Sequence, residues 1–214
     1  MGFAAVEFDV MLSSDRVPVL IHDETLERTT DGRGRVAETP FSGLAVLDAG
    51  NWFGNAYRGE PLPSLRQAGK LCVELGLWAN VEIKPARGFE RETGAIAAKL
   101  AGELWRGVAP LPLLSSFQPA ALEAARTAAP ELSRGLLTYR LDGGWRDMAL
   151  DLACVSVHCN FKHLTAAQAD EVHEAGLWLL CYTVNDADSA RRLFSWGVDA
   201  IFTDRLDLIR PELA

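Results

Sequence analysis

The stretch VEFDVMLSSDRVPVLIH, residues 6–22, combines a strand pattern with two acidic side chains. Side chains alternate between the two faces of a strand, so Glu7 and Asp9 share one face while apolar residues share the other. The apolar face can pack against helices. The acidic face sets two carboxylates side by side, and partly buried anions need a compensating cation. This strand therefore predicts a site that binds a positive charge.

A second strand pattern, NVEIK at residues 80–84, carries Glu82 and Lys84 on one face. In an α/β barrel, active sites lie at the carboxyl ends of the strands, where all of these charged residues are expected to meet. Three carboxylates suit Mg²⁺ or Ca²⁺ better than zinc, and a lysine beside them suits an anionic oxygen such as that of phosphate. An interior salt-bridge cluster is the alternative. Such a cluster would set three acidic side chains against one lysine, and this excess of negative charge favours a metal site.

Short apolar runs alternate with segments of helical periodicity along the chain, as in a parallel α/β fold. Helices are expected at about 64–76, 90–106, 119–129, 145–150, 165–175 and 187–196. The run VPVLI follows a short turn and is expected to pair antiparallel with the first strand. Seven strands then remain for the parallel sheet, a number that a doubly wound sheet can have, whereas a TIM (β/α)₈ barrel has eight in about 250 residues. We therefore expect such a barrel without its first βα unit, roughly 30 residues.

The segment from about residue 22 to residue 63 is rich in turn-forming residues and has no helical or strand periodicity. Connections of this length are usually functional or disordered. This one contains Trp52, Phe53 and Tyr57, which we expect to form a small core rather than a lipid-binding surface. The prediction is a single domain over residues 1–214, with an ordered insertion at about 22–63.

Composition narrows the classes of partner. The net charge of −8 argues against a nucleic-acid partner and against an anionic membrane surface. No apolar stretch is long enough to span a membrane, and the first residues lack the basic region of a signal peptide. The cysteines show no metal-binding spacing; they are Cys72, Cys154, Cys159 and Cys181. Buried free thiols in a cytoplasmic protein are the expectation.

His22 ends the run VPVLI and begins the insertion. A lone histidine is more often structural than catalytic. Beside a divalent cation and a lysine, however, it could move a proton near neutral pH, as metal-assisted phosphodiester hydrolysis requires. The position of His22 therefore makes it a candidate general acid or base.

The segments EFDV, VPVLIHDETLERTTDGRG, LPSL, NVEIKP, LLSSF, YTVN and GVDAIFTD resemble, in order and spacing, the bacterial cytosolic type of glycerophosphodiester phosphodiesterase. The resemblance implies a (β/α)₈ barrel with an insertion after its second strand. It implies hydrolysis of a small-molecule glycerophosphodiester to sn-glycerol 3-phosphate and an alcohol, with Mg²⁺ or Ca²⁺. By motif it makes Glu7, Asp9 and Glu82 metal ligands. The remaining matches are Lys84 as a phosphate contact, His22 as one of two acid/base histidines, and Tyr182 as an aromatic contact to the substrate.

One departure from the family pattern bears on activity. The family opens with a strand ending in His-Arg, followed by Pro-Glu-Asn-Thr, and no His-Arg pair occurs in these 214 residues. We therefore expect impaired catalysis in this chain. A non-catalytic barrel fragment that binds metal or phosphodiester is the alternative, and a metal-dependent lyase acting on phosphate-free acids is a weaker one. The motifs do not select the alcohol, the oligomeric state, or Mg²⁺ over Ca²⁺.

Overall fold

The computed structural model describes residues 2–210, and an eight-stranded sheet forms its centre. The strands are β1 (Ala5–Leu12), β2 (Pro18–Leu20), β3 (Trp78–Ile83), β4 (Leu113–Ser116), β5 (Ser133–Thr138), β6 (Ser156–Asn160), β7 (Trp178–Tyr182) and β8 (Ala200–Ile201). Their order is β2-β1-β3-β4-β5-β6-β7-β8. Every neighbouring pair is parallel except β1 and β2, which are antiparallel as expected for VPVLI.

Six helices follow the parallel strands: α2 (Leu65–Leu75), α3 (Glu90–Leu104), α4 (Pro119–Ala128), α5 (Trp145–Asp151), α6 (Ala166–Glu174) and α7 (Ala187–Ser195). Each begins and ends within two residues of its expected bounds. Local signals explain this accuracy. Ser64 and Thr165 form capping boxes at the starts of α2 and α6, and Pro119 opens α4.

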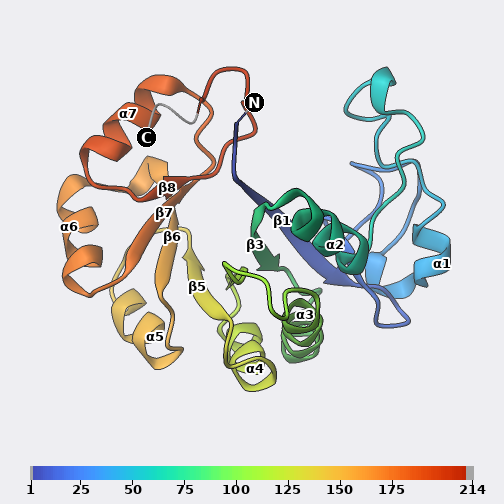
Figure 1. The fold of residues 1–214 in the computed structure, drawn as a ribbon, viewed down its shortest axis with the longest axis horizontal. Helices are drawn as coiled ribbons and strands as arrows, with labels where there is room; N and C mark the ends of the chain where they lie inside the picture. Colours follow the sequence, from blue (N-terminus) through green and yellow to red (C-terminus); the bar gives the residue numbers. More distant parts are fainter. Residues whose placement is uncertain (1, 211–214) are drawn as a thin grey trace.

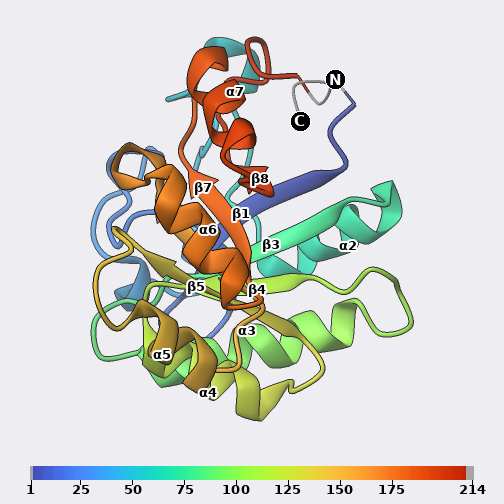
Figure 2. The same cartoon turned by 90° about the vertical axis from the view of Figure 1, so that its left-hand side faces the viewer.

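The sheet curls, and the helices cover its outer face (Figures 1 and 2). Within the described range, the strand order ends at β2 on one side and at β8 on the other, with no pairing between them. The architecture is thus a partly closed barrel of the (β/α)₈ type, which confirms the predicted fold class. The carboxyl ends of the parallel strands lie at the same end of this barrel, where active sites of the architecture are found.

Small residues bring α3 and α4 close together on the outside of the sheet. A Cβ atom on Gly94 would lie 2.2 Å from the Ala121 backbone oxygen, so only glycine fits there. Ala97, Ala98 and Ala101 continue the buried side of α3. This helix pair belongs to one of two large apolar clusters. The other cluster lies between the strands and helices of the C-terminal half.

The insertion contains three short helices, η1 (Val36–Glu38), α1 (Phe41–Leu44) and η2 (Asn55–Tyr57). It lies beside β1, apart from the other parallel strands (Figure 1). Its core is aliphatic and consists of Met11, Val19, Ile21, Leu26, Val36, Leu44, Leu62 and Ala86.

The expectation of an aromatic core in the insertion is wrong. The exposed fractions of Trp52, Phe53 and Tyr57 are 52%, 69% and 50%. The aliphatic side chains of β1, β2 and the loops already fill the interior, so the three rings stand outside it.

All four cysteines are buried and none forms a disulfide, as the sequence predicted. From residue 2 to residue 210, no helix is both long enough and apolar enough to cross a bilayer.

Candidate active site

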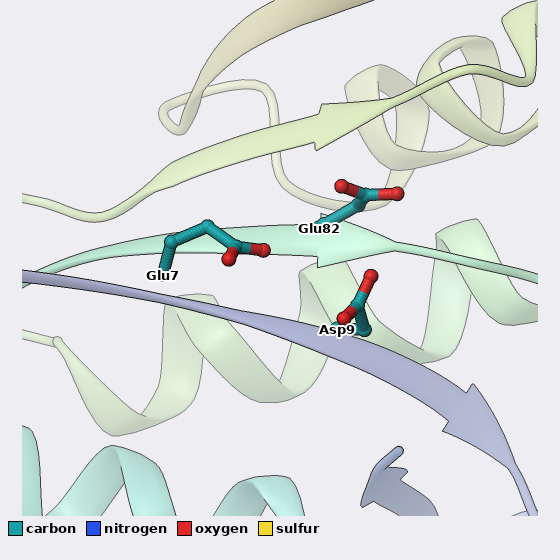
Figure 3. A group of neighbouring side chains, drawn as sticks. All are labelled: Glu7, Asp9 and Glu82. Carbon is teal, nitrogen blue, oxygen red and sulfur yellow. The ribbon is translucent and has the colours of Figure 1, made fainter. Parts of the chain in front are cut away.

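Glu7, Asp9 and Glu82 converge from two adjacent strands. Asp9 and Glu82 are partners in the register of β1 and β3, and Glu7 lies one pair earlier, opposite Asn80. One carboxylate oxygen from each of the three acids can be chosen so that all lie within 4.8 Å of one another. Figure 3 shows the three carboxylates pointing into the same space. The alternation that placed Glu7 and Asp9 on one face thus produces the predicted cluster.

Burial makes this cluster unfavourable without a cation. Burial, together with the charges of Asp9 and Glu82, raises the pKa of Glu7 to about 8. Burial and the charge of Asp9 raise the pKa of Glu82 to about 7. The Lys84 Nζ atom lies 3.4 Å from Asp9 Oδ1, and this single ammonium group offsets one of the three charges. The interior salt-bridge alternative is therefore incomplete, because two carboxylates remain uncompensated.

A cavity of about 1090 Å³ opens over the carboxylates. It is lined by all six residues that the sequence predicted to bind metal or substrate or to transfer a proton: Glu7, Asp9, His22, Glu82, Lys84 and Tyr182. Its walls come from the parallel strands on one side and from the insertion on the other. The tertiary structure therefore brings the whole predicted set to one place.

His22 belongs to a chain of three polar side chains. Its Nδ1 atom lies 2.7 Å from Asp23 Oδ1. Arg28 binds both carboxylate oxygens of Asp23, with an Nη2–Oδ1 distance of 2.9 Å, and lowers the pKa of Asp23. An ionised Asp23 holds the proton of His22 on Nδ1 and leaves Nε2 available to accept or donate one. The imidazole is 59% exposed, so a ligand in the cavity can reach it.

Tyr182 lies at the carboxyl end of β7. Its hydroxyl donates to the Thr138 backbone oxygen at 2.8 Å, and burial raises its pKa. Its ring stacks edge-on with Phe117, with 5.8 Å between the centroids. The hydroxyl proton is therefore used by the backbone, which leaves the ring for contact with a ligand.

The lining residues without a predicted role include Asp23, Arg28, Asn80 and Asp204. Asn80 is 2% exposed; its Nδ2 donates to Ser115 Oγ at 3.0 Å, and its Oδ1 has no partner among the described residues. Alternation could have found Asn80, since it lies two residues before Glu82 on the same face. Asp204 could have been found as the acid that follows the last strand.

The donor set fits a hard divalent cation. All three groups are carboxylates, which Mg²⁺ and Ca²⁺ prefer, and no sulfur or imidazole atom shares the cluster. The raised pKa values of Glu7 and Glu82 point the same way, because a bound cation would favour their ionised forms. The fold and the cavity thus define an α/β-barrel protein with a carboxylate-rich site at the strand ends.

The chain belongs to the glycerophosphoryl diester phosphodiesterase family, whose sequence profile matches residues 1–208. A glycerophosphodiester phosphodiesterase of Caldanaerobacter subterraneus is 31% identical, over 95% of this chain and 83% of the relative. The Bacillus subtilis protein YhdW is 30% identical, over 98% of this chain and 86% of YhdW. The resemblance recognised from the motifs is confirmed.

The solved structures agree with the sequence relatives. A phosphodiesterase of Oleispira antarctica, solved in complex with the product sn-glycerol-3-phosphate, superposes with a TM-score of 0.90 at 37% identity. The match covers 95% of this chain and 82% of that structure. The fold of the described residues is therefore that of a known phosphodiesterase over almost their whole length.

Proposed function

We propose that this chain hydrolyses glycerophosphodiesters to sn-glycerol 3-phosphate and an alcohol, with a divalent cation, Mg²⁺ or Ca²⁺. The observation that carries the proposal is the convergence of Glu7, Asp9 and Glu82 beside Lys84 in one cavity. The product bound in the Oleispira antarctica phosphodiesterase supports the choice of substrate. The buried free thiols support a cytoplasmic location.

Glu7, Asp9 and Glu82 would hold the cation through carboxylate oxygens. When bound there, a divalent cation supplies positive charge that orients the phosphodiester and stabilises its transition state. Lys84 adds a fixed ammonium charge for a non-bridging phosphate oxygen. Because Lys84 also contacts Asp9, its Nζ atom is held beside the cation site rather than free in solvent.

His22 would move the proton. Its Nε2 atom can donate a proton to the oxygen of the leaving alcohol as the phosphorus–oxygen bond breaks, or take one from the nucleophile. Asp23, which Arg28 binds, fixes the imidazole through Nδ1 and leaves Nε2 for this proton transfer. The ring of Tyr182 would pack against the substrate, since its hydroxyl is occupied by Thr138.

His22 is the only histidine that lines this cavity within residues 2–210. Hydrolysis that uses one histidine as base and another as acid then lacks one of the two groups, so we propose slow turnover by this chain alone. The same observation favours the second candidate function, binding of metal and phosphodiester without turnover.

The test is release of sn-glycerol 3-phosphate from glycerophosphocholine, with Mg²⁺, with Ca²⁺ and with EDTA. Activity is expected with at least one cation and none with EDTA. Glu82→Gln should lower it at least a hundredfold, because one cation ligand loses its charge. Glu74→Gln, on the exposed side of α2, is the matched control and should leave it unchanged.

The two candidate functions give different results. Binding of glycerol 3-phosphate that needs the cation, without turnover at high protein concentration, identifies the binder. Turnover that persists in EDTA and in Glu82→Gln contradicts the metal site altogether.

A further inference from the structure

Two aromatic side chains of the insertion form a corner in the cavity wall. Trp52 and Phe53 both line the cavity, although about half or more of each side chain is exposed. Their ring centroids are 5.6 Å apart and their planes meet at 71°. Exposed aromatic surface is costly, and the aliphatic core of the insertion does not need these rings. Their position therefore suits contact with a ligand in the cavity.

The corner is held rigidly by its own loop. Asp48 Oδ1 accepts hydrogen bonds from the backbone N–H groups of Gly50 and Asn51, both at 2.9 Å. Trp52 Nε1 donates to the Ala49 backbone oxygen at 2.9 Å, which orients the indole. Such pre-orientation lowers the entropic cost of binding a ligand.

Close backbone packing reinforces the loop. A Cβ atom on Gly50 would lie 1.9 Å from the Tyr57 backbone oxygen, so the chain can close here only at glycine. The Tyr57 ring in turn supports Phe53 edge-on, with 5.2 Å between centroids. The contact with Tyr57 thus restrains the Phe53 ring.

The excess negative charge of the cavity favours a ligand with a cationic group. Six carboxylates line the wall, those of Glu7, Asp9, Asp23, Glu60, Glu82 and Asp204, against two basic side chains, Arg28 and Lys84. A divalent cation would offset only two of the four excess charges, and a phosphodiester adds one more negative charge. A substrate whose alcohol is cationic therefore complements this cavity better than one whose alcohol is neutral.

Outside the cluster of Glu7, Asp9 and Glu82, Glu60 is the cavity carboxylate that has no partner among the described residues. Asp9 contacts Lys84, Asp23 contacts Arg28, and Asp204 accepts from Asn185 at 3.2 Å. Glu60 makes no ion pair or side-chain hydrogen bond with residues 2–210, yet it lines the cavity. It follows the aromatic loop, and its backbone oxygen accepts from Ala49 N–H at 2.8 Å. A carboxylate and two aromatic rings thus come from one short loop.

We infer that Trp52, Phe53 and Glu60 form a subsite for a cationic alcohol, above all a quaternary ammonium headgroup such as that of choline. The inference rests on the proposed function, because it assigns the leaving alcohol of the same substrate. Aromatic faces attract a quaternary ammonium through cation–π interaction, and the carboxylate adds a charge contact. Lys84 and a cation held by the carboxylate cluster would bind the phosphate, so positive charge would meet one end of the substrate and negative charge and aromatic rings the other.

The test compares two substrates that release the same product. Wild type is expected to use glycerophosphocholine with a kcat/KM about tenfold higher than that for glycerophosphoglycerol, whose alcohol is neutral. The double variant Trp52→Leu/Phe53→Leu should raise KM for glycerophosphocholine about tenfold and leave kcat/KM for glycerophosphoglycerol within twofold. Glu60→Gln should raise the same KM about threefold.

Trp178→Leu is the matched control. Trp178 is 62% exposed at the start of β7 and does not line the cavity. Its replacement should leave kcat/KM for both substrates unchanged. Equal losses on both substrates in the double variant, or no loss on either, would overturn the inference. Binding to phosphatidylcholine vesicles that the double variant abolishes, with unchanged kinetics, would also overturn it and identify the corner as a lipid contact.

Direct binding separates this inference from the proposed function. Saturation-transfer NMR on the chain in EDTA should show contact between the protein and the N-methyl protons of glycerophosphocholine. The signal should persist in Trp178→Leu and vanish in Trp52→Leu/Phe53→Leu. If no substrate is turned over but this pattern is seen, the hydrolytic function fails and the subsite stands. If turnover is normal and the signal is absent, the subsite fails alone.

Discussion

Asp9 and Glu82 are direct partners across the parallel strands β1 and β3, so their two carboxylates enter the cavity at the same level. Lys84 contacts Asp9, and Glu82 is only 8% exposed. This pairing brings together motifs that are more than seventy residues apart in the sequence. The repulsion it creates underlies the proposed cation site, and we expect it to make the stability of the chain depend on metal and on pH.

Addition of Mg²⁺ or Ca²⁺ should stabilise the folded chain, because the unfolded chain cannot hold the three carboxylates together. At a metal concentration a hundred times Kd, the gain is about 2.7 kcal/mol, or roughly 5–10 °C in Tm for a domain of this size. Thermal unfolding with the cation and with EDTA measures the difference. Asp9→Asn should lose most of the shift and Glu74→Gln should retain it. An equal shift in Asp9→Asn would contradict the site.

In EDTA the stability should fall as pH rises. Folding raises the pKa of Glu7 from an ordinary 4.5 to about 8 and that of Glu82 to about 7, so the folded chain binds more protons in that window. The free energy of unfolding therefore decreases with pH until both carboxylates are ionised.

Urea unfolding at pH 6.5 and at pH 9 checks this dependence. Burial lowers the pKa of His158 to about 3, so His158 increases stability as pH rises until its unfolded form is fully deprotonated, and above pH 6.5 this opposing change is smaller than that of the two carboxylates. The free energy of unfolding is expected to decrease by on the order of 1 kcal/mol between these two pH values, allowing for the partial exposure of Glu7. Glu7→Gln/Glu82→Gln should reduce the dependence, and the remainder comes from the thiols of Cys72 and Cys154, whose pKa values burial also raises. An unchanged slope in this variant would rule out these carboxylates as a cause.

His22→Ala should lower kcat by about two to four orders of magnitude, because it removes the proton-transfer group. Asp23→Asn should lower kcat less, by roughly tenfold or more, since it disturbs the tautomer of His22 but does not remove the imidazole. Steady-state kinetics on glycerophosphocholine measure both. His163→Ala, on η3 (Phe161–His163), is the control. Full activity in His22→Ala would exclude this histidine from the reaction.

Gly94→Ala should destabilise the chain by about 1–3 kcal/mol, because the new methyl group overlaps the Ala121 backbone oxygen and forces α3 and α4 apart. Gly102→Ala is the matched control on the same helix. There the methyl group would meet only the mobile end of the Glu131 side chain, at 2.9 Å, so the higher helix propensity of alanine should dominate. Urea midpoints compare the two, and equal effects would refute the role of close packing.

The sequence by itself determined the helices, the parallel strands and the acidic cluster, because these depend on local signals. Capping boxes mark α2 and α6, and strand alternation places Glu7 beside Asp9 and Glu82 beside Lys84. The rule that parallel strands end on one side of a sheet then brings the two motifs together. These steps need no knowledge of distant contacts.

Only the tertiary structure decided how the insertion faces the site. The rings of Trp52 and Phe53 were expected inside a core, but aliphatic residues from β1 and β2 occupy that interior, so the rings line the cavity instead. Likewise, the hydroxyl of Tyr182 is used by a backbone oxygen on β5, and the partners of Asp23 follow from how the loop folds back. Competition among residues for one interior depends on volumes and distances across the fold, which local pattern does not encode.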